Sequence, residues 1–523
     1  MLLSGAMARL ALFFWLGIPA VTFGVPPADR WVPVRWDGGP LEVARRAQSP
    51  QAPADNPGVR EALAGWYDPS TLTLLEGTPV NCLLVTFSAE VDPDIEKRQH
   101  RLAQDYARMA RDRGIAVLGI VHPGRDPVAI AEAADEARLD GLVLEAGFPG
   151  GALFAGKLRE ALRARNSTAA VIPIERDPAP VRRSAATLAA VEGVRPSARN
   201  LADMGIRAGA SAEPWIESNI WLVRSFRLGN ARRPVWISQE PNPGSPDDYT
   251  RCVADASVAG GHWIVSLDDQ LRVGLFRKEP EALAAWRSIA GYLKFAEDHS
   301  EWRNFEPYGN VAIILDAGGD HPDFADEYLN LVARRHIPYR IVLRSDLNPA
   351  SLAGFRAVLA ADMARPSDAE RTILQTFAEK GGLVIAGPWW GNAPTDTDYA
   401  SAPAGKGQIV VYKDEPPDPE TVARDMLDLL EPEVTGLAVF NVPSVLTYAS
   451  TGDAGKRALV QLLNYATTPF DSKITIRLKG SFKRARLHTP GNEPADLTVR
   501  LMPNDWTEFS VPKLAVWGAV LLE

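Results

Sequence analysis

From residue 32 to residue 267 the chain repeats one pattern, in which a short apolar run is followed by a longer stretch of helical periodicity. This alternation predicts βα units around a parallel sheet. The eight apolar runs lie at 32–36, 82–87, 115–121, 141–144, 169–174, 191–194, 235–238 and 263–267. Helices are expected at 95–113, 128–137, 156–164, 181–190, 214–227, 246–259 and 280–295. Eight units predict a (β/α)8 TIM barrel of about 250 residues.

A second βα series begins near residue 310 and predicts a small doubly wound α/β domain. Its strands are expected at 311–315, 339–343, 357–360, 383–386 and 408–411, and a further helix at 420–430. Beyond residue 434 the period changes to the alternation typical of strands, at 459–463, 473–478, 495–501 and 506–511. These runs predict an all-β sandwich. The expected domains are therefore 25–305, 306–432 and 433–523.

The first residues predict a targeting segment. Arg9 precedes an apolar run at 10–23, and Gly24-Val25-Pro26-Pro27 follows it. The run has about 14 residues, fewer than the roughly 20 that a transmembrane helix needs, although an uncleaved anchor is an alternative. We therefore expect a secretory signal over 1–24, a secreted or periplasmic protein and no stable membrane span after cleavage.

Composition narrows the possible functions. The formal net charge is −9 and no basic stripe is present, which argues against a nucleic-acid partner. Cys82 and Cys252 are the two cysteines, too few for a disulfide framework or a thiolate zinc site. The seven histidines show no metal-binding spacing, and no P-loop, GxSxG or GxGxxG motif occurs at a strand end. We predict neither a metal nor a cofactor.

The domain order, together with Leu462-Leu-Asn-Tyr465 and the ending Pro512-Lys-Leu-Ala-Val-Trp517, resembles glycoside hydrolases of the family 42 β-galactosidase type. The resemblance implies a middle domain similar to glutamine amidotransferases that is inactive and helps to build a trimer. Residues 310–412 contain no cysteine that could act as the amidotransferase nucleophile, which agrees with an inactive domain. A homo-oligomer is expected through this resemblance alone.

Glycoside hydrolysis needs two carboxyl groups, and barrel enzymes place such groups at the C-terminal ends of strands. Glu145 follows the fourth expected strand and Glu240 the seventh. The resemblance implies that Glu145 is the acid/base and Glu240 the nucleophile, although the family has Asn where this chain has Leu144. Glu175, Asp268 and Asp269 are the other strand-end candidates, and each carboxylate has the alternative of a helix cap or an ion pair.

Aromatic and amide side chains near the last strands are candidates for binding sugar rings and hydroxyls. They are Trp215, Asn219, Trp236, Gln239 and Trp263. Trp215 is expected to begin a helix near the barrel mouth, whereas Trp236 and Trp263 lie within strands and have the alternative of filling the core.

The sequence thus predicts a secreted glycoside hydrolase acting on an oligosaccharide or polysaccharide. A non-catalytic carbohydrate-binding or cell-surface protein with a degenerate barrel is the alternative, and hydrolysis of another bond is a third. Carboxylates held in ion pairs would favour the non-catalytic alternative.

Overall fold

The computed structural model describes residues 24–48, 56–183, 186–199, 215–230, 232–240, 244–316, 318–319, 321–440, 442 and 444–523. The expected signal segment falls outside these residues except for Gly24. Among the described residues, no helix combines the length and the apolar character that a membrane span requires.

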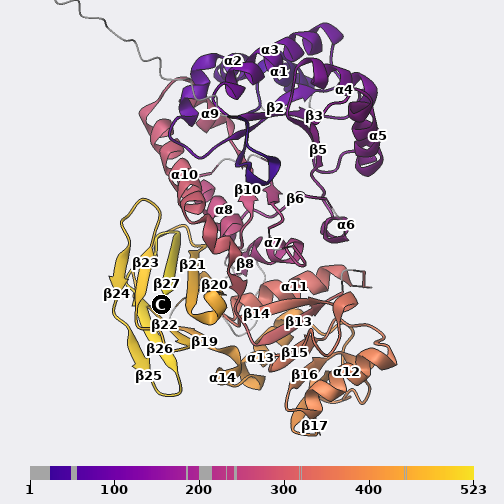
Figure 1. The fold of residues 1–523 in the computed structure, drawn as a ribbon, viewed down its shortest axis with the longest axis vertical. Coiled ribbons are helices and arrows are strands. Elements are labelled where there is room, and N and C mark those ends of the chain that lie inside the picture. The colour runs from indigo at the N-terminus through magenta and orange to yellow at the C-terminus, as the bar shows by residue number, and fades with distance from the viewer. Residues whose placement is uncertain are drawn as a thin grey trace, which may run out of the picture.

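Eight parallel strand positions form a closed barrel in the N-terminal half (Figure 1). The strands are β1 (Pro33–Arg35), β2 (Cys82–Ser88), β3 (Ala116–Val121), β4 (Gly141–Leu144), β5 (Ala170–Pro173), β6 (Ala189–Glu192), β9 (Val235–Ser238) and the split strand β10 (His262–Trp263) with β11 (Val265–Ser266). β10 pairs with β9 and β11 pairs with β1, while a bridge from Glu175 to Val191 joins β5 to β6. The predicted TIM barrel is confirmed.

The barrel interior is filled by alternate residues of the strands, because successive side chains of a strand point to opposite faces. Leu84, Leu118, Val143, Trp236 and Ile264 belong to one buried cluster inside the ring. The barrel centre is therefore packed, which leaves the two ends of the strands as separate surfaces.

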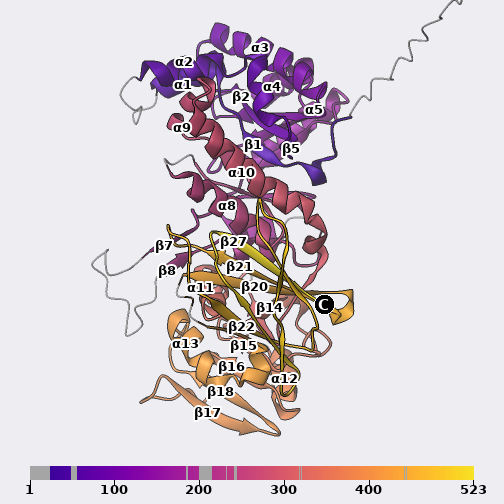
Figure 2. The same cartoon turned by 90° about the vertical axis from the view of Figure 1, so that its left-hand side faces the viewer.

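Helices surround the barrel (Figures 1 and 2). They are α1 (Gly39–Gln48), α2 (Pro57–Gly65), α3 (Pro93–Arg111), α4 (Pro127–Glu136), α5 (Gly151–Ala164), α6 (Pro178–Arg183), α7 (Ile220–Phe226), α8 (Pro246–Val258), α9 (Asp269–Phe276) and α10 (Pro280–Asp298). Several begin at an Asp-Pro pair. The Asp92 and Asp126 side chains accept backbone N–H bonds at the starts of α3 and α4, and the following proline suits the first helical turn.

The prediction of a helix over 214–227, beginning near Trp215, is wrong in its first part. Residues Trp215–Glu217 form strand β8, which pairs antiparallel with β7 (Ser197–Arg199), and α7 begins only at Ile220. Strand pairing therefore overrides the helical periodicity around Trp215.

The middle part of the chain forms a parallel sheet whose order is β14-β13-β15-β16-β18. The strands are β13 (Val311–Leu315), β14 (Tyr339–Leu343), β15 (Ala357–Ala360), β16 (Leu383–Ala386) and β18 (Gly407–Tyr412), with β17 (Tyr399–Ala404) antiparallel at the edge. In chain order this is 2-1-3-4-5, the flavodoxin-like arrangement. Helices α11 (Pro322–Arg334), α12 (Asp368–Glu379) and α13 (Pro419–Leu429) accompany the sheet, and the short α14 (Pro432–Thr435) follows.

The C-terminal part forms two antiparallel sheets, as predicted. One has the order β12 (Glu306–Pro307), β20 (Val445–Gly452), β21 (Arg457–Asn464), β27 (Trp517–Leu522), β23 (Ala485–His488) and β24 (Ala495–Leu497). The other has β19 (Leu437–Phe440), β22 (Ile474–Lys479), β26 (Trp506–Val511) and β25 (Arg500–Met502). The run 495–501, expected as one strand, contributes to both sheets. Val460, Ile476 and Phe509 share the buried core of this part.

Candidate functional site

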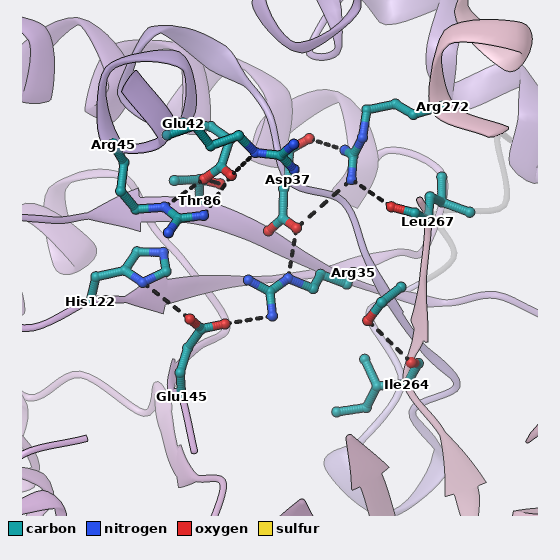
Figure 3. Close-up of polar contacts among 12 residues, drawn as sticks. Arg35, Asp37, Glu42, Arg45, Thr86, His122, Glu145, Ile264, Leu267 and Arg272 are labelled. Atoms are coloured by element: carbon teal, nitrogen blue, oxygen red, sulfur yellow. Dashed lines mark hydrogen bonds and ion pairs between the residues drawn. The ribbon is translucent and has the colours of Figure 1, made fainter. Parts of the chain in front are cut away.

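The C-terminal mouth of the barrel is polar because the inward-facing positions change from apolar to polar at the strand ends. Along β2 the interior residue Leu84 is followed two positions later by Thr86, and beyond β3 and β4 the corresponding positions are His122 and Glu145. Figure 3 shows Glu145 between His122 and Arg35, which lies at the end of β1. Four neighbouring strands thus direct polar groups to one place.

Glu145 occupies the centre of this cluster. Its Oε1 lies 2.5 Å from Arg35 Nη1, and its Oε2 lies 3.1 Å from His122 Nδ1. Burial alone would raise the pKa of Glu145, but the Arg35 guanidinium and the hydrogen bond and charge of His122 outweigh it and lower the pKa to about 2. The side chain is 27% exposed. Glu145 is therefore ionised at neutral pH and still reachable from solvent.

Arg35 is itself held by a buried network. Its Nε donates to Asp37 Oδ2 at 2.6 Å. The fully buried Arg272 donates to the backbone carbonyls of Asp37 and Leu267, and its Nη2 lies 3.8 Å from Asp37 Oδ2. Since Arg272 is on α9, which follows the last strand of the barrel, the network ties that helix to the end of the first strand. It fixes the guanidinium that Glu145 faces.

A second carboxylate, Glu42 on α1, lies behind this network and is fully buried. It pairs with Arg45 and Arg46 at 2.7 Å each and accepts a bond from Thr86 Oγ1 at 3.2 Å. The attraction of the two arginines outweighs the effect of burial, so the pKa of Glu42 lies well below its ordinary value. Glu42 was absent from the predicted site. Its arginines follow it by three and four positions, the spacing of neighbours on a helix, and that signal could have revealed the cluster.

The two adjacent aspartates have different surroundings. Asp268 is buried, accepts Tyr249 Oη at 2.8 Å and caps α9 by accepting Leu271 N at 2.9 Å. Asp269 pairs with Arg46 at 2.6 Å. Both carboxylates are thus engaged by donors of the fold, which is the alternative that the sequence left open for them.

Glu240, Gln239 and Trp263 meet at a small cavity of about 30 Å³ beside α8. Glu240 is exposed, Gln239 is half-buried and Trp263 is buried. A cavity of this size holds about one water molecule, so it brings these three predicted residues together without itself accommodating a sugar ring.

The sequence and the fold were compared with those of known proteins. No protein-family model matches the sequence, and no curated protein matches it. Among solved structures, an α-L-fucosidase isoenzyme 2 from Paenibacillus thiaminolyticus superposes with a TM-score of 0.56 and 11% identity, covering 94% of this chain and 99% of that chain. This chain therefore shares the fold of that solved structure.

Two further solved structures are similar at lower scores. A β-galactosidase from Bacillus circulans sp. alkalophilus has a TM-score of 0.38 and 10% identity, covering 82% of this chain and 68% of its own. A rhamnosidase from Novosphingobium sp. PP1Y has a TM-score of 0.40 and 12% identity, and the match covers 81% of this chain and 39% of the rhamnosidase. The superposition on the fucosidase, with its TM-score of 0.56, is what confirms the predicted resemblance to glycoside hydrolases, and it does so for the fold alone.

Glu175 lies at the end of β5 and is half-buried. Its backbone bridges to Val191, and it lines a cavity of about 620 Å³ formed by residues of α5, β5 and β6. Its neighbour Arg176 pairs with Glu192 at 2.9 Å.

The remaining predicted binding residues lie away from Glu145. Trp215 packs against the core of the middle sheet, with Arg334 of α11 4.8 Å from its ring centre. Asn219 is buried and bonded to Val194 and Asp255. Trp236 fills the barrel interior.

Among the described residues, no group of three or more histidines, cysteines and carboxylates is arranged to hold a metal ion.

Proposed function

We propose that this chain is a glycoside hydrolase whose reaction takes place at the C-terminal mouth of the barrel, with Glu145 as the carboxylate that is ionised at neutral pH. The observation that carries the proposal is the contact of Glu145 with Arg35 and His122 at the end of β4. TIM-barrel enzymes build their active sites at this end of the strands.

The charge of Glu145 decides its role. A general acid must carry a proton before the reaction, and a carboxyl group with a pKa of about 2 carries none at neutral pH. An ionised carboxylate instead suits attack on the anomeric carbon or stabilisation of the positive charge that develops there. We therefore assign Glu145 the role of nucleophile or charge stabiliser, the reverse of the role that the family resemblance implied.

Glu240 is our proposed proton donor. It is exposed after β9, the seventh strand of the barrel, where a leaving-group oxygen can reach it from solvent. Glu175, half-buried after β5, is the second candidate for this role. Asp268 and Asp269 are less suited because one caps a helix and the other pairs with Arg46.

The proposed substrate is a carbohydrate met outside the cytoplasm, in agreement with the expected signal segment. A screen of aryl glycosides would determine the identity of the sugar. It should include α-L-fucosides and β-D-galactosides, because two of the similar structures are an α-L-fucosidase and a β-galactosidase. A trimer remains a prediction from the family resemblance, and size-exclusion chromatography with light scattering would test it.

The decisive experiment compares Glu145→Gln and Glu240→Gln on the best substrate of the screen. We expect Glu145→Gln to lower turnover by roughly three orders of magnitude or more for every leaving group. Glu240→Gln should lower it by about a hundred- to ten-thousandfold for poor leaving groups. It should have much less effect on a dinitrophenyl glycoside, which needs no proton to depart. Glu160→Gln, at an exposed position on α5, is the matched control.

A binding protein without turnover is the second candidate function. It is favoured by the ion pairs at the mouth, since each Glu145 oxygen already has a cationic or imidazole partner and Asp37 is bound by Arg35. Calorimetric binding of an oligosaccharide by a protein that hydrolyses no glycoside of the screen would support this function and contradict the hydrolase proposal.

A further inference from the structure

A second polar cavity lies at the opposite end of the barrel, where the strands begin. Its volume is about 590 Å³, within the range of small-molecule sites. Its basic lining comes from several elements: Arg30 precedes β1, Arg232 and Arg233 precede β9, Arg227 follows α7, Arg303 lies in the 3-10 turn Ser300–Asn304, and His262 opens β10. No sequence motif marked these residues, because they are scattered along the chain.

The lining is strongly basic. Five arginines face two carboxylates, Asp29 and Glu297, which gives a local net charge of +3 with the histidine neutral. The whole chain carries −9. A basic cavity in an acidic protein attracts anions selectively. The arginines repel one another because the fold holds them close together, and a bound anion reduces this repulsion.

Two of the buried groups have donor capacity that the fold does not use. Arg233 is 7% exposed and donates Nη1 to the backbone carbonyl of Val181 at 3.2 Å, while its Nε and Nη2 have no partner among the described residues. His262 is also 7% exposed; its Nε2 contacts Glu297, and its Nδ1 has no partner among the described residues. An unmatched buried donor is costly, typically by about 1–3 kcal/mol, unless a ligand or water satisfies it.

Arg227 is held in place by the backbone. Arg227 donates to the carbonyls of Ala259 at 2.6 Å and of Arg303 at 2.8 Å. Gly260 permits this position, because a Cβ there would lie 1.9 Å from Arg227 Nη1. Burial lowers the pKa of Arg227, and the neighbouring Arg303 charge lowers it further, as expected where cations are gathered.

From this arrangement we propose that the cavity binds the oxyanion group of a small acidic ligand, namely a sulfate, a phosphate or a carboxylate. Arginine is well suited to all three, since its planar guanidinium donates two parallel hydrogen bonds to such groups. The cavity is distinct from the catalytic mouth because the packed interior cluster that includes Trp236 and Ile264 separates the two ends of the barrel. The proposal does not depend on the hydrolase assignment.

Isothermal titration of the full chain with glucose 6-sulfate, glucose 6-phosphate and glucuronate tests the proposal, with glucose as the neutral control. The three anions share the pyranose ring and differ at C6, so the best binder identifies the oxyanion. We expect at least one to bind and glucose not to bind. Binding should weaken between low and high salt, because the attraction is electrostatic.

The double variant Arg30→Glu/Arg232→Glu reverses two exposed charges of the cavity and changes its net charge from +3 to −1. We expect it to weaken binding by about tenfold or more. Arg98→Glu, an exposed change on α3 that does not line the cavity, should bind as the wild type does. Glu145→Gln should also bind normally, which separates this site from the mouth.

Three results would overturn the proposal. One is that no anion binds at a concentration of about 10 mM, because a specific site should have a dissociation constant below that concentration. Another is equal binding by the double variant and the wild type. The third is loss of binding in Glu145→Gln, which would place the ligand at the mouth. If circular dichroism shows that the double variant is unfolded, Arg232→Gln alone replaces it in the same comparison.

Discussion

The ion pair between Arg35 and Glu145 should be one of the strongest polar contacts at the barrel mouth. The pKa of Glu145 falls from 4.5 to about 2, and at about 1.4 kcal/mol per pKa unit this corresponds to about 3 kcal/mol of stabilisation of the charged form. Arg35 is the strongest of the attractive partners. Arg35→Met keeps an unbranched, flexible side chain and removes its charge. We expect it to lower the free energy of unfolding by about 3–5 kcal/mol, because Glu145 then keeps only His122 and Asp37 only the more distant Arg272 as a partner.

A double-mutant cycle with Glu145→Gln isolates the pairwise energy. Urea unfolding followed by tryptophan fluorescence reports on the barrel, where Trp36, Trp66 and Trp236 are fully buried. We expect a coupling of about 2–3 kcal/mol at pH 7. Because the folded pKa lies below the unfolded one, this stabilisation is fully present above pH 4.5 and is lost as the pH falls toward 2.

The control is Arg108→Met on α3, where Arg108 faces Asp105 at 3.0 Å with both side chains exposed. It should change stability by no more than about 0.5 kcal/mol. A coupling between Arg35 and Glu145 below about 0.5 kcal/mol, or one that is the same at pH 3 and pH 7, would refute the reasoning that Arg35 holds Glu145 ionised.

Two further predictions concern buried carboxyl groups elsewhere. Tyr465→Phe removes the hydroxyl that donates to the fully buried Asp255 at 2.6 Å. It should destabilise the protein by about 1–3 kcal/mol and speed limited proteolysis between barrel and sandwich; unchanged urea midpoints and cleavage rates would contradict this. Burial and the nearby Asp316 charge raise the pKa of Asp362 from 3.8 to about 7, so its contribution to stability is present below pH 3.8 and is lost as the pH rises to 7. Asp362→Asn should therefore stabilise the middle sheet by up to about 4 kcal/mol at pH 8 and by nearly nothing at pH 3.5, and equal effects at the two values would exclude this origin.

Strands that contain an apolar run were located from the sequence, and exposed strands were not. The expected bounds 141–144, 311–315 and 357–360 are those of β4, β13 and β15, whose residues are all buried. Strand β17 was not predicted because most of its residues are exposed, so no apolar run marks it. The same limit applies to 495–501, a largely exposed run that divides between two sheets.

The strand-end carboxylates of the candidate site were predictable from the sequence, but the arginines that hold them were not. A carboxylate directly after an apolar run marks a strand end, and this signal located Glu145 and Glu240 without any knowledge of their partners. Arg35 and Arg272 are brought together only because β11 pairs with β1 and closes the ring. A contact that depends on closure of the whole barrel has no local signature in the sequence.

These partners change the chemistry that can be assigned to the mouth. The sequence suggested two carboxyl groups in the roles of acid and nucleophile, but it could not say which of them holds a proton. Arg35 and His122 supply that answer for Glu145, because a carboxylate stabilised by a cation and a hydrogen bond gives up its proton readily. Any proton delivered to a leaving group must then come from a group other than Glu145. Glu240, exposed after the seventh strand, and Glu175, half-buried after the fifth, are the other predicted strand-end candidates that neither cap a helix nor pair with Arg46, so the proton donor is to be sought between the fifth and seventh strands of the barrel.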